Sequence, residues 1–98
     1  MAKAKTARAH KPVIVRTYSA GVHFGYLVQR DGKDVVLERS RRIWYWKGAN
    51  TLNEIALHGV GAGSKVSEPV SITLTEAIEV IDCAKAAVMS LEAAKWGT

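Results

Sequence analysis

The residue types best suited to binding chemistry gather in one short stretch, Arg41-Arg42-Ile43-Trp44-Tyr45-Trp46-Lys47. Indole rings stack on planar bases, and a guanidinium group pairs with phosphate through two parallel hydrogen bonds. The alternative interpretation is that the tryptophans pack in the core and the cations frame them. An arginine beside two tryptophans is costly to bury without an anionic partner. We therefore interpret this stretch as part of a site for an anionic, nucleotide-like ligand.

Polar and aromatic side chains of an earlier stretch extend the candidate site. His23 follows the turn signal Ser19-Ala20-Gly21 on a predicted strand, where it could line a pocket. In this hypothesis the tyrosine and tryptophan rings stack on a base, while arginine and lysine hold phosphates. The predicted ligand-binding residues are Tyr18, His23, Tyr26, Arg41, Arg42, Trp44, Trp46 and Lys47.

The sequence contains no recognisable catalytic or metal-binding set, and we expect neither an enzyme nor a cofactor. The three histidines, His10, His23 and His58, lack the spacing of metal ligands. Cys83 is the single cysteine and has no histidine beside it, so we interpret it as a buried thiol. The glycine-rich segment 61–65 resembles part of a phosphate loop, but its spacing is wrong and a proline opposes the helix that should follow.

Length and composition describe one small globular domain. The chain has 98 residues, of which 48% are hydrophobic and 23% are charged, as in ordinary folded proteins. No apolar run approaches the roughly 20 residues of a membrane span. The basic N-terminus lacks the apolar segment of a secretory signal, and a single cysteine permits no intrachain disulfide. These features predict a protein of the reducing cytoplasm.

The positive charge is uneven along the chain. The formal net charge is +5, but residues 68–98 are acidic overall and residues 1–11 contain only basic charges. We predict that residues 1–11 form a disordered basic arm and that residues 12–98 form a single domain. As an alternative function, the arm binds nucleic acid through Lys3, Lys5, Arg8 and Lys11.

The hydrophobic pattern predicts an α+β fold, in which one short helix and one C-terminal helix pack on a small antiparallel sheet of about five strands. Short turns, including Asp31-Gly32-Lys33, make the first strands a meander. Residues 76–82 fit either a strand or a helix, and the pattern leaves both open. The predicted strands are 13–18, 22–30, 34–38, 42–47 and 70–75, and the predicted helices are 51–58 and 83–95.

Local signals refine these elements. Thr51 and Glu54 have the spacing of a capping box at the start of the first helix, and Gly59 is suited to follow its end. Asp82 is a suitable N-cap for the C-terminal helix, and residues 60–65 read as a flexible glycine-rich loop. A period of two places three candidate residues on one face of their strand, namely Arg42, Trp44 and Trp46.

Two segments, 16–27 and 41–49, resemble a largely uncharacterised family of small proteins encoded by tailed bacteriophages and prophages. The motifs that carry the resemblance are SAGVHFGYL and RRIWYWKGA, within a region of resemblance that spans residues 13–95 and leaves the basic arm outside. The resemblance implies expression in the cytoplasm of an infected bacterial cell, or a place in the virion. It carries over no catalytic residue.

These observations lead to three functional hypotheses. The first is a small non-enzymatic phage protein that binds an anionic nucleotide-like ligand as a homo-oligomer and sequesters a host immune signal. The alternatives are a DNA- or RNA-binding accessory protein, and a minor virion or assembly protein whose tryptophans anchor an interface. We expect a homo-oligomer because the alanine-rich C-terminal helix and Trp96 leave apolar surface that a second copy could cover.

Overall fold

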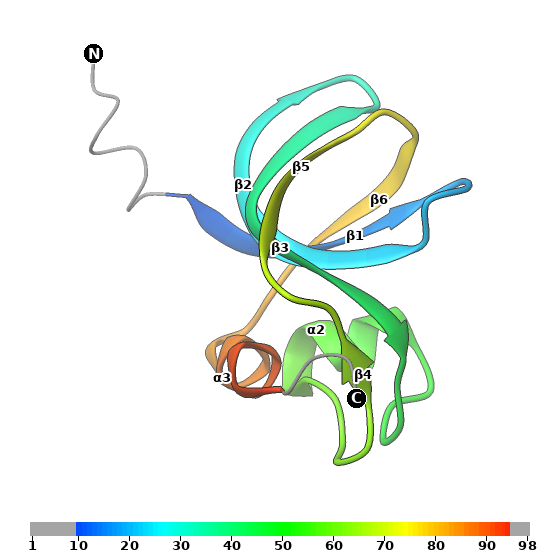
Figure 1. Cartoon of the computed structure of the whole chain (residues 1–98), viewed down its shortest axis with the longest axis vertical. Coiled ribbons are helices and arrows are strands. Elements are labelled where there is room, and N and C mark those ends of the chain that lie inside the picture. The colour runs from blue at the N-terminus through cyan, green and yellow to red at the C-terminus, as the bar shows by residue number, and fades with distance from the viewer. Residues whose placement is uncertain (1–9, 95–98) are drawn as a thin grey trace.

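The computed structural model describes residues 10–94 of the chain, and these residues form the predicted α+β fold. In this part of the chain six antiparallel strands make one sheet, and two helices lie together at one end of it (Figure 1). Residues 1–9 of the predicted arm lie outside the described residues, whereas Lys11, which the prediction placed in the disordered arm, is the first residue of β1. The elements are β1 (Lys11–Thr17), β2 (Val22–Asp31), β3 (Asp34–Tyr45), α2 (Leu52–His58), β4 (Lys65–Val66), β5 (Val70–Leu74), β6 (Ala77–Asp82) and α3 (Lys85–Ala93).

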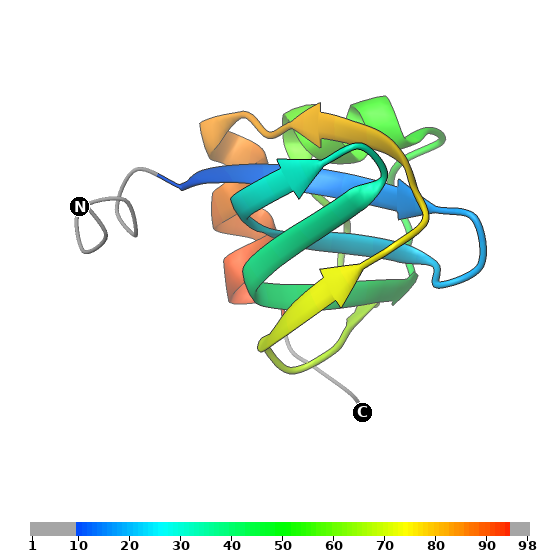
Figure 2. The ribbon, with the colours of Figure 1, turned by 90° about the horizontal axis from the view of Figure 1, so that it is seen from above.

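The first three strands form the predicted meander, and the sheet curls around it. The strand order is β4-β3-β2-β1-β6, and β5 pairs with β3 outside this path. Residues 76–82, which the pattern left open, contain β6, and this strand returns to pair with β1. Seen from above, the strands wrap around one another instead of lying flat (Figure 2). The curl encloses the inner face of the sheet.

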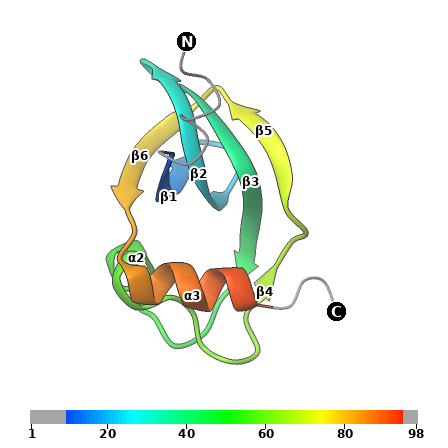
Figure 3. The same ribbon diagram turned by 90° about the vertical axis from the view of Figure 1, so that its left-hand side faces the viewer.

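Strand β1 is covered on both faces, and this divides the core into two clusters. Val13, Ile14 and Val15 are all fully buried. Ile14 belongs to the cluster that includes residues of α2 and α3, the helix-side cluster, whereas Val13 and Val15 belong to the other, the inner cluster. Figure 3 shows α3 lying across the end of the curled sheet. Burial on both faces explains why β1 is a continuous apolar run and does not alternate.

Strand β3 is one long strand where the sequence predicted two, at 34–38 and 42–47. It runs without a break from Asp34 to Tyr45. Its pairing with β5 shifts register between Leu37 and Ser40, and Arg39 in this interval has a positive φ of 50°. The polar residues that suggested a loop therefore form an irregularity within a strand, as in a β-bulge. This irregularity sets which side chains of the second half of β3 face each side.

Trp44 and Trp46 do not share a face, so the predicted alternation is wrong at the end of β3. Trp44 is 54% exposed, whereas Trp46 is partly buried and packs against the helix-side cluster that contains Ile43. Strand β3 ends at Tyr45, and its pairing with β4 shifts register between Ile43 and Tyr45. The loss of regular strand geometry there turns Trp46 toward the core.

Helix α2 follows its predicted signals. The Thr51 hydroxyl accepts a hydrogen bond from the Glu54 amide at 3.2 Å, and the Glu54 carboxylate accepts one from the Asn50 amide at 2.6 Å. Gly59 follows the helix with a φ of 85°, a conformation that favours glycine. The predicted capping box is therefore confirmed at the Thr51 hydroxyl, while Glu54 reaches the residue before the cap.

Helix α3 starts later than predicted, and a short strand was not predicted at all. Asp82 is the last residue of β6, so the prediction that it caps the helix is wrong, and Ala84 occupies the N-cap without a side-chain hydrogen bond. Strand β4, only two residues long, ends the glycine-rich loop and pairs with β3. Within residues 10–94, no helix is long and apolar enough to span a bilayer.

Candidate functional site

A pocket of about 520 Å³ lies where β2, β3 and β5 meet the connection between β4 and β5. We call it the His23 pocket. Three of the predicted ligand-binding residues line it. Its lining residues are His23, Ser40, Arg42, Trp44, Ser67, Glu68, Val70 and Ile72.

Sheet register brings the polar residues of the His23 pocket together. His23 lies directly opposite Arg42 in the pairing of β2 with β3, and residues opposite each other in an antiparallel pair project on the same side. Ser40, Arg42 and Trp44 occupy alternate positions of β3, so they share that side. Val70 of β5 pairs with Ser40 and adds an apolar wall.

The connection that closes the pocket is fastened to β3. The Ser67 amide donates to the Arg42 carbonyl oxygen at 2.9 Å, and the Arg42 amide donates to the Ser67 hydroxyl oxygen at 2.8 Å. These two bonds hold Ser67 against Arg42 of β3, in the way that backbone hydrogen bonds hold two paired strands together. They leave the Arg42 side chain available.

His23 is a neutral imidazole with a defined tautomer. It is only 1% exposed, and its Nε2 lies 2.9 Å from the carbonyl oxygen of Ala20. Burial lowers the pKa of His23; the hydrogen bond to Ala20 opposes this, and the charge of Arg42 lowers the pKa further. Because a carbonyl only accepts, Nε2 carries the proton and Nδ1 presents a lone pair. Nδ1 is buried and has no hydrogen-bond partner in the described part of the chain.

Ser40 presents a second unpaired polar atom in the same pocket. The residue is 1% exposed, and its hydroxyl oxygen has no partner among residues 10–94. A buried polar group without a partner costs about 1–3 kcal/mol, and such groups are rare in native structures. The His23 Nδ1 and the Ser40 Oγ are the two buried side-chain atoms of this kind in the described residues, and both belong to the His23 pocket.

The outer part of the pocket is cationic and aromatic. The exposed Arg42 guanidinium makes no hydrogen bond or ion pair with any of residues 10–94. The Lys65 ammonium lies 5.8 Å from the centre of the Trp44 ring, in a cation–π arrangement. Glu68 adds one carboxylate to the lining. The pocket therefore combines a polar floor, at His23 and Ser40, with apolar walls and a rim that carries Arg42.

Arg41, the neighbour of Arg42, has a different environment. It is 4% exposed, and its guanidinium donates to the carbonyl oxygens of Ser67, Leu91, Glu92 and Ala94 at 2.7–3.1 Å. Three of these oxygens lie at the C-terminal end of α3, where carbonyl groups lack helical partners. Arg41 therefore joins α3 to the sheet, and four of its five N–H donors are occupied.

Tyr26 lies on the helix side of the sheet. Its hydroxyl donates to the Glu92 carboxylate, and the Arg39 guanidinium lies 5.1 Å from the centre of its ring. Arg39 also donates to both oxygens of Glu92, at 2.9 and 3.0 Å. Burial, followed by the contact with Glu92, raises the pKa of Tyr26 to about 12. This cluster is a second attachment of α3 to the sheet.

Trp46 and Lys47 are not among the residues that line the His23 pocket, and Lys47 contacts the glycine-rich loop. Trp46 packs against the helix-side cluster. The Lys47 amide donates to the Ser64 hydroxyl at 2.9 Å, and the Lys47 carbonyl accepts from the Gly61 amide at 2.7 Å. These contacts fix the position of the loop relative to the end of β3.

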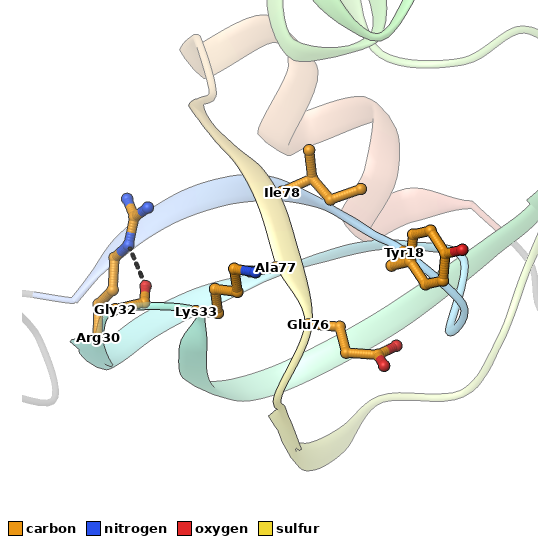
Figure 4. A pocket seen from close by; sticks show the side chains of 7 residues that line it. All are labelled: Tyr18, Arg30, Gly32, Lys33, Glu76, Ala77 and Ile78. Atoms are coloured by element: carbon orange, nitrogen blue, oxygen red, sulfur yellow. Dashed lines mark hydrogen bonds between the residues drawn. The ribbon is translucent and has the colours of Figure 1, made fainter.

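Tyr18 lines a second pocket of about 550 Å³ (Figure 4). Figure 4 shows Tyr18 and Glu76 toward one side of the strand that carries Ala77, with Arg30 and Lys33 toward the other. The Arg30 Nε donates to the Gly32 carbonyl at 3.3 Å, and the Glu76 carboxylate accepts from the Ser19 hydroxyl. None of the lining residues of this second pocket has a buried polar atom without a partner. We therefore take the His23 pocket as the candidate site.

The residues of the alternative nucleic-acid set are mostly beyond the described part of the chain. Lys3, Lys5 and Arg8 lie outside residues 10–94. Lys11 begins β1, and its ammonium lies 3.4 Å from the Asp82 carboxylate.

Sequence reasoning missed five residues of the pocket. Ser40 was assigned to a loop between two strands, although positions 40, 42 and 44 would have shared a face had one strand been drawn through them. The other four come together through long-range contacts with β3, namely the pairing of β5 and the two hydrogen bonds between Ser67 and Arg42, for which the sequence contains no local signal. They are Ser67, Glu68, Val70 and Ile72.

The comparisons with known proteins identify a family and no function. The chain belongs to the family described as "Domain of unknown function (DUF6948)", whose model matches residues 10–91. The match spans every residue of the His23 pocket. No curated protein and no solved structure matches the chain.

Proposed function

We propose that this protein is a small binding module that takes an anionic, nucleotide-like ligand in the His23 pocket. The observation that carries the proposal is a pair of buried polar atoms, the His23 Nδ1 and the Ser40 Oγ, in one pocket with the Arg42 guanidinium. None of these groups has a hydrogen-bond partner among residues 10–94. A ligand that supplies hydrogen-bond partners to these atoms removes the free-energy cost of leaving buried polar groups unpaired.

The size and lining of the pocket support a ligand of this class. Its volume of about 520 Å³ lies within the range of roughly 300–1,000 Å³ typical of small-molecule sites. Trp44 offers an exposed ring, and stacking of a base on an aromatic side chain contributes about 1–3 kcal/mol. Arg42 is suited to a phosphate, which it can hold through two hydrogen bonds.

Binding without turnover fits the reactive groups of the described residues. Burial raises the pKa of Cys83 to about 12, so its thiol stays protonated and is a poor nucleophile. His23 is neutral, and its Nε2 is held by the Ala20 carbonyl. Sequestration of a host signal, in a phage-infected cell, is the cellular role that we propose for such a module.

The proposal is tested by calorimetric titration of the full chain with AMP, GMP, CMP and UMP. We expect at least one of them to bind, and Arg42→Ala to weaken that binding by about tenfold, or about 1.4 kcal/mol. Arg30→Ala is the matched control, because Arg30 is an exposed arginine that lines the second pocket. The proposal fails if none of the four binds, or if Arg30→Ala weakens binding more than Arg42→Ala does.

A further inference from the structure

The two ends of the His23 pocket differ in the hydrogen bonds that they can make. At the floor, the His23 Nδ1 can only accept, and the Ser40 hydroxyl can donate or accept. At the rim, the Arg42 guanidinium can only donate and carries a positive charge. A ligand that satisfies both ends must therefore bring a hydrogen-bond donor to the floor and an anion to the rim.

We infer, building on the binding function proposed above, that the ligand enters base first. A ring N–H or amino group of the base donates to the His23 Nδ1, a neighbouring polar atom of the same base edge pairs with the Ser40 hydroxyl, and the phosphate stays at the rim with Arg42. His23 is then a specificity-determining residue. The ligand class becomes nucleotides with a buried base edge, and free phosphate and sugar phosphates bind more weakly because they bring no donor to the floor.

The opposite orientation is unfavourable for electrostatic reasons. Phosphate oxygens at the floor would face the lone pair of the His23 Nδ1, with only the Ser40 hydroxyl to donate. The phosphate would also lose its hydration without gaining a cation, which is costly in a buried site. The phosphate is therefore stable only on the side of Arg42.

The floor of the pocket requires a ligand that has a base with a hydrogen-bonding edge, but it does not distinguish one base from another. Each nucleobase carries a donor next to an acceptor on its Watson–Crick edge, and proteins read these edges when the base is unpaired. The Ser40 hydroxyl can rotate to donate or accept, so it adapts to any of these edges. The base must bring a hydrogen-bond donor to His23, because the neutral Nδ1 has no proton to donate.

The side chains around the floor must move when the base enters, because Nδ1 and Oγ are both covered in the structure. Arg42 is placed to make this movement. It lies directly opposite His23 in the sheet, it is exposed, and no partner among residues 10–94 holds its guanidinium. In this account, Arg42 turns toward the phosphate at the rim, and the base takes the space beside His23.

The test compares each of AMP, GMP, CMP and UMP with ribose 5-phosphate, which carries the same phosphate without a base. The full chain is titrated, and NMR detects the ring nitrogens of His23. We expect ribose 5-phosphate to bind at least about tenfold more weakly than the best mononucleotide. That mononucleotide should move the Nδ1 resonance of His23 in the direction of an accepted hydrogen bond, while ribose 5-phosphate leaves it unchanged.

A matched variant separates the acceptor from the structural role of His23. His23→Gln retains an amide N–H that can donate to the Ala20 carbonyl but removes the acceptor at the Nδ1 position. We expect it to weaken mononucleotide binding by about fivefold or more and to leave the weaker binding of ribose 5-phosphate unchanged. Circular dichroism shows whether the variant folds, and the Nδ1 resonance of the wild-type chain decides the question if it does not.

The outcomes distinguish this inference from the function on which it rests. If a mononucleotide binds through Arg42 but leaves the His23 ring nitrogens unchanged, the base-first orientation is wrong and the binding function stands. If ribose 5-phosphate binds as tightly as the mononucleotides, or shifts Nδ1 itself, the orientation is also wrong. If no mononucleotide binds at all, both proposals fall.

Discussion

The Ser40 hydroxyl is buried and has no hydrogen-bond partner in the described part of the chain. Its substitution therefore separates an effect on stability from an effect on ligand binding. Ser40→Ala removes a buried polar group that has no hydrogen-bond partner among residues 10–94. We expect the free energy of unfolding to stay the same or to rise by about 1 kcal/mol, while mononucleotide affinity falls by about fivefold. Urea denaturation and calorimetric titration measure the two effects.

The opposite pattern would contradict this assignment of Ser40. If Ser40→Ala destabilises the fold by more than about 1 kcal/mol and leaves affinity unchanged, the hydroxyl serves the fold. Ser71→Ala is a suitable control, because Ser71 is an exposed serine on β5 outside the pocket lining.

We expect the free energy of unfolding to depend on pH through the protonation of His23. Burial lowers the pKa of His23 below its ordinary value of 6.5, so the unfolded chain takes up this proton at a higher pH than the folded chain. Below about pH 6.5 the unfolded state therefore binds more protons, and stability falls as the pH falls. We expect the melting temperature to decrease from pH 7.5 to pH 5 by a larger amount in the wild type than in His23→Gln. Equal decreases in both proteins would show that other groups cause the effect.

At the scale of elements, substitution of the two adjacent arginines of β3, Arg41 and Arg42, tests which side chain attaches α3 to the sheet. Arg41 donates four hydrogen bonds from a buried guanidinium, three of them to the end of α3. We expect Arg41→Ala to lower the free energy of unfolding by about 3 kcal/mol, because buried carbonyl groups lose charged donors. Arg42→Ala should change it by less than about 0.5 kcal/mol, as is usual at an exposed position.

Urea denaturation of the two arginine variants decides between these roles. Equal losses of stability, or a larger loss in Arg42→Ala, would contradict the separation between the attachment of α3 and the ligand site.

The elements that could be predicted from the sequence are those with local signals. The hairpins follow from turn residues, and α2 follows from its Thr51 cap and Gly59 end. Strand β3 could not be predicted as one element, because the four polar residues 39–42 are typical of a connection between strands. The bulge at Arg39 has no sequence signal of its own. Strand β4 is two residues long and exists only through its pairing with β3.

Only part of the candidate site could be predicted, because local sequence signals reveal neighbouring strands but not long-range pairing. His23, Arg42 and Trp44 meet because β2 and β3 are neighbours in a meander, which short turns predict. Tyr18, Tyr26, Arg41, Trp46 and Lys47 carry suitable chemistry, but the curl of the sheet and the position of α3 place them elsewhere. Residue type and spacing identified which residues have side chains suited to binding an anionic ligand. The residues that β5 adds to the pocket depend on its long-range pairing with β3 and could not be identified in this way.

At the scale of the whole molecule, the basic arm can be separated from the pocket. The pocket residues named above all lie between His23 and Ile72, so we expect a chain of residues 10–98 to bind mononucleotides with unchanged affinity. Calorimetric titration at two salt concentrations measures this. A loss of binding on deletion, with a steep dependence on salt, would favour the alternative of nucleic-acid binding through the arm.

The homo-oligomer stays a prediction. Met89 of α3 is 69% exposed and Leu57 of α2 is 53% exposed, so both helices offer apolar side chains to a second copy. Trp96, which also motivated this prediction, lies outside the described residues. Native mass spectrometry of the full chain gives the oligomer mass and shows whether a ligand from the host cell is retained.

The most direct test of the central claim is chemical-shift mapping of the backbone amides while AMP, GMP, CMP and UMP are added in turn to the full chain. We predict that the nucleotide that binds best shifts signals around the His23 pocket, including those of His23, Ser40, Arg42, Trp44 and Val70. Shifts centred on Tyr18, Arg30 and Lys33, or no shifts with any of the four nucleotides, would contradict the assignment of this pocket as the ligand site.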